Sequence, residues 1–145
     1  MSADTCLICD RQRTADPTRL VDGEHAVLLH YPCDERTPEV YRGHLFVEPK
    51  RHVTVFGELS DDEAAEAGRL MAAGSRLLTG VLSAEHVYVF SIQHLVAHVH
   101  IHLVPRYPGT PEEHWGGTEL VRWEGGPRIE ADEVERVVSR LREAL

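Results

Sequence analysis

The sequence is poor in cysteine and in long apolar runs, and each scarcity excludes a class of protein. Its 145 residues include 3 cysteines, of which Cys6 and Cys9 form a Cys-x-x-Cys pair. Outside a secretory context, that spacing is typical of metal or redox chemistry and not of a structural disulfide. No stretch approaches the roughly 20 apolar residues of a membrane span, so we expect no membrane association. Because residues 1–10 lack the basic and apolar regions of a signal peptide, we predict a cytoplasmic protein.

Positive charge is scarce as well. The chain has 15 basic and 24 acidic residues, which give a formal net charge of -9. Such a chain repels a nucleic-acid backbone, so we expect no nucleic-acid partner. A small anionic ligand remains compatible, because histidines and backbone N–H groups can build a local site against the overall field. The hydrophobic fraction of 42% is that of a globular protein, and the length fits one domain.

The hydrophobic pattern predicts an α+β fold. We expect strands over 25–31, 44–48, 86–92 and 96–104, helices over 60–82 and in the last fifteen residues, and loops over 32–42 and 107–127. Ser60 and Glu63 have the spacing of a capping box at the start of the long helix. Strands and helices that do not alternate regularly favour an antiparallel sheet over a doubly wound parallel one.

Histidine is the abundant residue, and it is clustered. Four of the 10 histidines fall within nine positions, and the segment 98–104 reads His-Val-His-Ile-His-Leu-Val. In a strand, alternate side chains share one face at a spacing of roughly 7 Å, so three imidazoles would line one face and three aliphatic side chains the other. Aligned imidazoles can ligate a metal, or one can attack an electrophile while its neighbours orient it.

Three segments of the sequence resemble the histidine triad (HIT) family. Residues 98–104 match its His-φ-His-φ-His-φ-φ signature, where φ is apolar, and Pro-Arg follows. Residues 43–52 resemble its Gly-His-x-φ-φ-φ-Pro-Lys-x-His segment. Cys6-Leu7-Ile8-Cys9 is similar to the Cys-x-x-Cys of its zinc-containing members. The resemblance covers about residues 5–107.

The resemblance implies a HIT-like fold. We expect an antiparallel sheet of about five strands, one long central helix and a C-terminal helix, with the helices packed against one face. Residues 1–145 would form a single domain, in which 1–22 carry the Cys-x-x-Cys pair and 108–145 form a C-terminal loop and helix. A homodimer is implied as well.

The resemblance also implies a mechanism. His100 would attack the α-phosphorus of a nucleoside phosphate derivative and form a nucleotidyl-histidine, which water or another acceptor releases. His102 would hydrogen-bond the phosphoryl oxygens or the leaving group, and His44 would help to orient the triad. Covalent catalysis of this kind splits one difficult displacement into two easier steps. The implied activity is that of a nucleotide hydrolase or nucleotidyl transferase.

The same resemblance implies a structural zinc ion bound by Cys6, Cys9, His52 and His98. Two thiolates and two imidazoles form a closed tetrahedral set, which suits a structural site and not a catalytic one. The alternative is that the two cysteines form a redox motif or a chance pair. Cys33 is expected to be a buried apolar residue.

The turn before the triad departs from the family pattern. Where a Gly-Gln-Ser-like sequence usually supplies phosphate contacts, residues 91–95 read Ser-Ile-Gln-His-Leu. We therefore treat Gln93 and His94 as candidate substrate-binding residues, with the alternative that His94 is an ordinary loop histidine. Arg106 is a third candidate, because its guanidinium can bind an anion.

Two other function classes stay open. Three histidines could form a catalytic zinc site with an open water position, although imidazoles at i, i+2 and i+4 of one strand span too far for one ion. The chain could also be a non-catalytic nucleotide-binding or interaction module. The sequence leaves the base, the leaving group and the choice between hydrolysis and transfer open.

Overall fold

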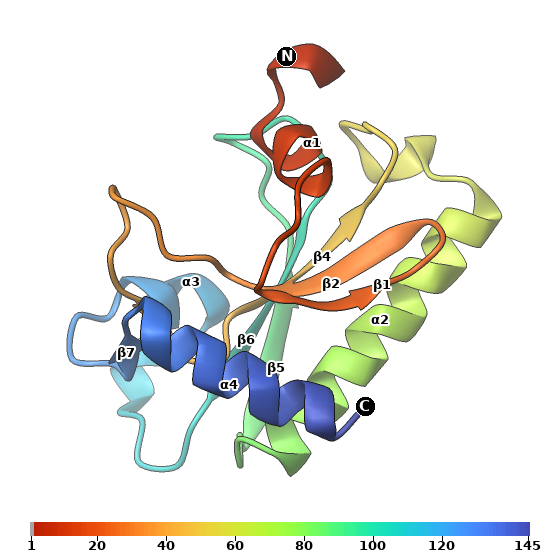
Figure 1. Ribbon diagram of the computed structural model, residues 1–145. Coiled ribbons are helices and arrows are strands. Elements are labelled where there is room, and N and C mark those ends of the chain that lie inside the picture. The colour runs from red at the N-terminus through yellow and green to blue at the C-terminus, as the bar shows by residue number, and fades with distance from the viewer. Residues whose placement is uncertain (1) are drawn as a thin grey trace.

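Five antiparallel strands form the central sheet of the computed structural model, which describes residues 2–145 (Figure 1). The order of the strands across the sheet is β1-β2-β4-β6-β5. Their bounds are β1 Arg19–Asp22, β2 Ala26–His30, β4 Leu45–Pro49, β5 His86–Phe90 and β6 Ile101–Arg106. The α+β class and the five-stranded antiparallel sheet predicted from the sequence are therefore confirmed.

Helices and a small second sheet complete the fold. The helices are α1 Leu7–Gln12, α2 Asp61–Gly80, α3 Gly117–Arg122 and α4 Ala131–Glu143, with 3-10 turns at Ala3–Thr5, Phe56–Glu58 and Glu112–His114. Strand β3 (Val40–Tyr41) pairs with β7 (Arg128–Ile129) in a separate two-stranded sheet. No helix within residues 2–145 has the length and apolar character needed to cross a membrane.

The long helix α2 begins where its capping box predicts. The Ser60 Oγ accepts a hydrogen bond from the Glu63 backbone N–H at 3.2 Å, and the Glu63 carboxylate accepts one from the Ser60 backbone N–H at 2.8 Å. Gly74 lets the helix approach the sheet closely, because a Cβ there would lie 2.9 Å from a Leu103 methyl carbon and 3.2 Å from one of Leu28.

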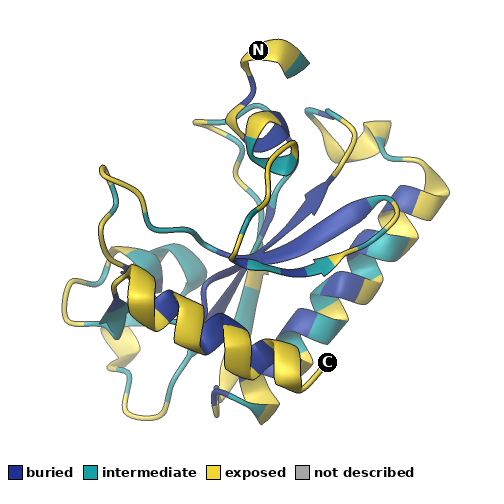
Figure 2. Ribbon diagram, in the orientation of Figure 1, coloured by how far each residue is buried: buried dark blue, intermediate teal, exposed yellow. Residues whose placement is uncertain are grey.

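Both faces of the sheet bear buried side chains, and Figure 2 shows its central strands as a continuous buried layer. One face packs on α2 and α4 in the main core, to which α4 contributes Val134, Val137, Val138 and Leu141. On the other face, Val27, Leu29 and Phe46 form a smaller apolar cluster. The histidines described below lie beside this cluster.

The last strand differs from its prediction at both ends. We expected residues 96–104, but β6 is Ile101–Arg106, and residues 96–100 have no regular structure. The reason is a turn in which the His98 N–H donates to the Val96 carbonyl and the Val99 N–H donates to the Val53 carbonyl. These bonds take the place of strand-ladder hydrogen bonds, so the strand begins only after His100.

Several short elements occupy stretches predicted to be polar segment or loop. Helix α1 and strand β1 lie in residues 1–22, β3 lies in 32–42, and α3 lies in 107–127. Helix α3 also corrects the expectation that all helices share one face, because its Leu120 packs with Val104 on the face opposite α2. Elements of two to six residues are too short to show a hydrophobic period, so tertiary packing decides them.

Candidate functional site

The three triad histidines do not share one site. His98 lies against the Cys-x-x-Cys pair, whereas His100 and His102 lie together, with ring centroids 5.1 Å apart. The expected continuous strand does not carry all three imidazoles, because β6 begins after His100 and contains only His102. The arrangement separates a potential metal ligand from two potential catalytic groups.

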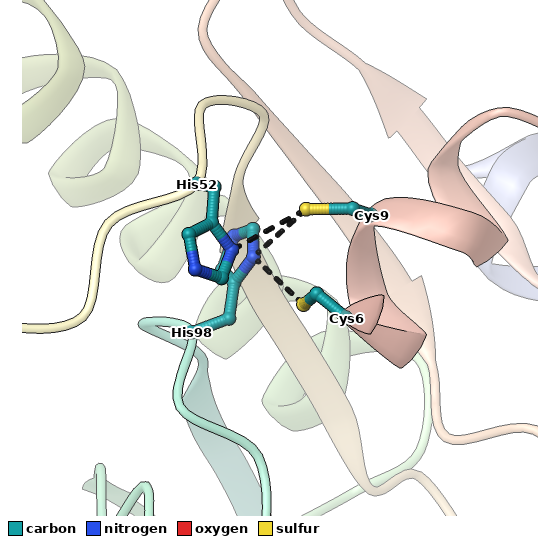
Figure 3. A group of neighbouring side chains, drawn as sticks. All are labelled: Cys6, Cys9, His52 and His98. Atoms are coloured by element: carbon teal, nitrogen blue, oxygen red, sulfur yellow. Dashed lines mark hydrogen bonds between the residues drawn. The ribbon is translucent and has the colours of Figure 1, made fainter. Parts of the chain in front are cut away.

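The four predicted metal ligands converge (Figure 3). Cys6 and Cys9 come from the start of α1, and His52 and His98 come from the loops after β4 and before β6. One potential ligand atom from each lies within 4.8 Å of all the others. No other group of three or more His, Cys, Asp or Glu residues in the described chain has this geometry.

The distances within this cluster fit a tetrahedral zinc ion. Bond lengths of about 2.3 Å to sulfur and about 2.0 Å to nitrogen place the two ligand atoms about 3.5 Å apart in a tetrahedron. The His98 Nδ1 lies 3.4 Å from the Cys6 Sγ and 3.5 Å from the Cys9 Sγ, and the His52 Nδ1 lies 3.5 Å from the Cys9 Sγ. Burial, together with the neighbouring Cys6, raises the pKa of the Cys9 thiol to about 11, so a thiolate there requires a cation beside it.

A backbone carbonyl fixes the tautomer of His98. Its Nε2–H donates to the Pro49 carbonyl at 2.8 Å, which leaves the Nδ1 lone pair facing the two thiols. A metal-binding histidine usually donates its other ring N–H in this way. The His98 side chain is fully buried, so this orientation is also sterically held.

His100 has the opposite tautomer. Its Nδ1–H donates to the His98 carbonyl at 2.7 Å, which leaves the lone pair on Nε2. Burial lowers the pKa of His100, and the positive charge of Arg11 lowers it further. A neutral imidazole with an unused Nε2 lone pair is a nucleophile near neutral pH.

His102 is held by a second histidine and by aromatic rings. One hydrogen bond of 3.0 Å joins the His44 Nε2 to the His102 Nδ1. The His102 ring stacks on Phe90 at 4.6 Å and meets Phe46 edge-on at the same centroid distance. Burial lowers the pKa of His102 to about 4, with the nearby His100 adding to the effect, and burial holds the pKa of His44 well below its ordinary value.

His100 and His102 line a hollow of about 420 Å³, called here the histidine hollow. Its lining residues are Leu7, Ile8, Arg11, Tyr31, Pro32, Asp34, Phe46, Glu48, Leu95, Val96, His100 and His102. A volume of this size suits a small-molecule ligand. The apolar residues offer a surface for a flat ring, and two imidazoles stand in the same wall.

Arg11 and Glu48 are lining residues that the sequence analysis missed. Their side chains form an ion pair, in which the carboxylate of Glu48 is fully buried and the guanidinium of Arg11 is one-quarter exposed. The available signal was Glu48 itself, an acidic residue at an apolar position of the 43–52 segment. Its partner stands 37 positions away, beyond any local pattern.

The three predicted substrate-binding residues lie in different places. Gln93 has a left-handed backbone (φ 60°), and its amide donates to the Ser91 Oγ, whose hydroxyl donates to the His100 carbonyl. His94 is exposed and is not a lining residue of the histidine hollow. Arg106 lies beyond His102 on β6, with its guanidinium 3.9 Å from the Trp115 ring.

Comparison with solved structures identifies similar folds. The chain superposes on a HIT-like protein involved in cell-cycle regulation from Bartonella henselae with a TM-score of 0.70 and 16% identity, over 100% of both chains. A zinc-bound histidine triad family protein from Mycobacterium smegmatis gives a TM-score of 0.69 and 18% identity, over 99% of this chain and 97% of the other.

A third structure, a hypothetical histidine triad nucleotide-binding protein from Sulfolobus tokodaii, gives a TM-score of 0.70 and 20% identity over 96% and 91% of the two chains. No protein-family profile matches the sequence, and no curated protein matches it significantly. The likeness to these structures establishes that the chain has the HIT-like fold.

Proposed function

We propose that the protein is a nucleotide hydrolase or nucleotidyl transferase that acts at the α-phosphorus of a nucleoside phosphate derivative. The observation that carries this proposal is the tautomer of His100, whose Nδ1–H is bound to the His98 carbonyl so that the Nε2 lone pair is free at the wall of the histidine hollow. The HIT-like fold and the nucleotide-binding description of the Sulfolobus tokodaii protein support the substrate class.

In the first step, the Nε2 of His100 attacks the α-phosphorus. A nitrogen–phosphorus bond forms, the bond to the leaving group breaks, and its electron pair departs with the leaving group. The imidazole of the adduct carries positive charge, which the His98 carbonyl stabilises by accepting from Nδ1–H. In the second step, water or another acceptor attacks phosphorus, its proton passes to solvent, and the electron pair returns to Nε2.

His102 and His44 assist this reaction as a pair. When His44 donates its Nε2–H to the His102 Nδ1, the His102 Nε2–H is available to bind a phosphoryl oxygen or the leaving group. The depressed pKa of His102 supports a neutral donor near pH 7. His44 touches His102 rather than the histidine hollow, so its role is positioning.

Gln93, His94 and Arg106 are retained as proposed substrate contacts. Gln93 supports the backbone of His100 through Ser91. His94 and Arg106 would reach a part of the substrate that extends out of the histidine hollow, such as the leaving group. We further propose a homodimer in the cytoplasm, with no nucleic-acid partner, consistent with the net charge of -9.

Cys6, Cys9, His52 and His98 would hold a structural zinc ion. Their spacing fits the ion, and the zinc-bound Mycobacterium smegmatis protein has the same fold. All four positions are taken by protein ligands, so the ion would stabilise the packing of α1 on the rest of the chain and leave no position for water. Its role is separate from the reacting groups.

The test compares the wild type with His100→Ala on adenosine phosphoramidate and on dinucleoside polyphosphates, by following nucleotide release. We expect turnover by the wild type on at least one substrate and none by the variant, with circular dichroism unchanged. Binding without turnover in both proteins would favour a non-catalytic module. Turnover that survives in His100→Ala would contradict the nucleophile.

A further inference from the structure

The histidine hollow contains one permanent cation. Among the described residues that line it, Arg11 is the single lysine or arginine, and it shares this wall with His100. The neighbouring His102 is a neutral donor near pH 7 and adds no charge. In a chain with a net charge of -9, an anionic ligand needs such a local cation to offset the unfavourable overall field.

Arg11 reaches the histidine hollow because α1 carries it there. Leu7, Ile8 and Arg11 stand at i, i+1 and i+4, so they lie on one side of the helix and line the hollow. Cys9 belongs to the cluster of four potential metal ligands (Figure 3), and the Gln12 amide donates to the Pro49 carbonyl at 3.2 Å. These contacts fix α1, and with it the backbone of Arg11, beside the histidine hollow.

Glu48 holds the guanidinium of Arg11 by an ion pair. Its fully buried carboxylate accepts from the Arg11 Nη2 and, at 3.4 Å, from the Gln12 amide. A buried ion pair is weak evidence for stability, because apolar side chains of similar volume often stabilise a fold as well or better. Stability alone therefore does not account for this pair.

The guanidinium has donors left for a ligand. Among the described residues, its hydrogen bond goes from Nη2 to Glu48, while its buried Nε lies 3.9 Å from an Asp16 oxygen without a hydrogen bond. Arginine has five N–H groups in a planar fork that matches phosphate oxygens. The carboxylate of Asp34, the other acidic lining residue, is engaged by the backbone N–H groups of residues 36 and 37.

Among residues 91–95, the turn before the triad, Leu95 lines the histidine hollow, and its side chain is apolar. The Gln93 amide is bound to Ser91, and His94 is exposed outside the histidine hollow. We propose that Arg11, held by Glu48, binds an anionic oxygen of the substrate phosphate and so selects phosphorylated over neutral ligands. This inference rests on the proposed function for the identity of the site, and it assigns the phosphate contact to the N-terminal helix.

Ligand binding tests this assignment. Isothermal titration calorimetry would measure the four 5′-nucleoside monophosphates and the nucleoside that corresponds to the tightest of them. The main variant is Arg11→Met with Glu48→Met, which removes both charges of this pair. Asp16, which lies 3.9 Å from the Arg11 Nε, keeps the hydrogen bonds that it accepts from Thr18. Arg11→Lys keeps the charge without the fork. The matched control is Arg13→Met, because Arg13 lies in the same segment and pairs with Asp10 on the exposed surface.

We expect the double variant to bind the monophosphate about 10- to 100-fold more weakly, as for the loss of a charged hydrogen bond. Its affinity for the nucleoside should stay within about twofold of wild type, and Arg13→Met should match wild type for both ligands. Arg11→Lys should give an intermediate loss. Zinc content and thermal unfolding, measured on the same samples, report whether α1 is still in place.

Three results would overturn the inference: an unchanged monophosphate affinity in a folded double variant, an equal loss for monophosphate and nucleoside, and no monophosphate binding by the wild type. If the double variant does not fold, Arg11→Lys takes its place. A ratio of monophosphate affinity to nucleoside affinity equal to that of the wild type would then overturn the inference. His100→Ala separates this inference from the proposed chemistry. Arg11-dependent monophosphate binding by a wild-type protein that shows no turnover, or whose turnover survives in His100→Ala, would support the phosphate contact and contradict the nucleotidyl-histidine mechanism.

Discussion

His98 and His100 stand two positions apart, yet the backbone gives them opposite free nitrogens. His98 donates its Nε2–H to the Pro49 carbonyl and directs Nδ1 to the thiols of Cys6 and Cys9. His100 donates its Nδ1–H to the carbonyl of His98 and keeps the lone pair on Nε2. The same side chain is thereby prepared as a metal ligand in one place and as a nucleophile in the other.

The carbonyl partner, and not the residue type, therefore assigns the chemistry of each ring. The two partners come from separate parts of the chain, since Pro49 ends β4 and the His98 carbonyl belongs to the turn before β6. Changes at one histidine should therefore affect one property and spare the other. Substitutions at the two histidines, at the metal ligands and at residues away from both sites test that separation.

Exchanging each histidine for glutamine should give opposite results. His100→Gln removes the nucleophile, so we expect the rate of nucleotide release to fall about 10³-fold or more, while zinc content and the midpoint of thermal unfolding stay unchanged. His98→Gln should reduce zinc content and lower the midpoint. Zinc would be measured by atomic absorption. Loss of zinc in His100→Gln would show that the two sites are one unit.

Removing the metal should destabilise the fold. A ligand that binds the folded state stabilises it by about 4 kcal/mol when its free concentration is 1,000 times the Kd, so Cys9→Ser or chelation should remove a contribution of this order. Urea unfolding with and without a chelator measures it. Cys33→Ser is the matched control, because Cys33 lies outside the cluster and should keep its zinc. Equal sensitivity of wild type and Cys9→Ser to the chelator would contradict this prediction.

A third buried histidine, His30, makes stability depend on pH. Its Nδ1–H donates to the Tyr31 carbonyl and its Nε2 accepts from the Gly43 N–H, so both nitrogens are used by the neutral ring. Burial lowers the pKa of His30 from 6.5 to about 4. As the pH falls from 6.5 to 4, the unfolded chain takes up a proton that the folded chain does not, and stability falls with the pH.

The full shift corresponds to about 3 kcal/mol, which is present above pH 6.5 and lost toward pH 4. Urea unfolding of the wild type and His30→Gln at several pH values would measure this contribution as the difference in slope. His44 and His102 also have lowered pKa values, so the variant should retain part of the dependence. If the free energy of unfolding depended on pH equally in the two proteins, His30 would not contribute to the pH dependence.

Two glycines on α2 should respond in opposite directions and leave both histidine sites intact. Gly74→Ala places a methyl group against Leu103 and should cost about 1–3 kcal/mol of stability by overpacking. Gly68→Ala meets no atom within 4 Å and should add about 0.5–1 kcal/mol through helix propensity. Urea unfolding gives both values. A change in the ratio of activity to zinc content in either variant would show that the sites depend on the packing of α2.

The elements that could be predicted are those with a long or locally specified pattern. Helix α2 has a capping box within four residues and an apolar face over twenty, and both signals are local. The strands β2, β4 and β5 were found near their true bounds, because apolar runs bounded by turn residues identify them. Helix α1 was missed because its six residues cannot show a helical period, and its place depends on contacts with residues far along the chain.

Within the candidate site, the residue types were readable and their neighbours were not. Caps, periodicity and motif spacing act over short distances, so the α+β class, the long capped helix and the relevant histidines and cysteines could be read from the sequence. Only the tertiary structure reveals that His98 and His100 have opposite tautomers, and that Arg11 pairs with Glu48 in the histidine hollow. The physical reason is that a ring tautomer and a buried ion pair depend on groups brought together by the packing of α1 and the turn before β6.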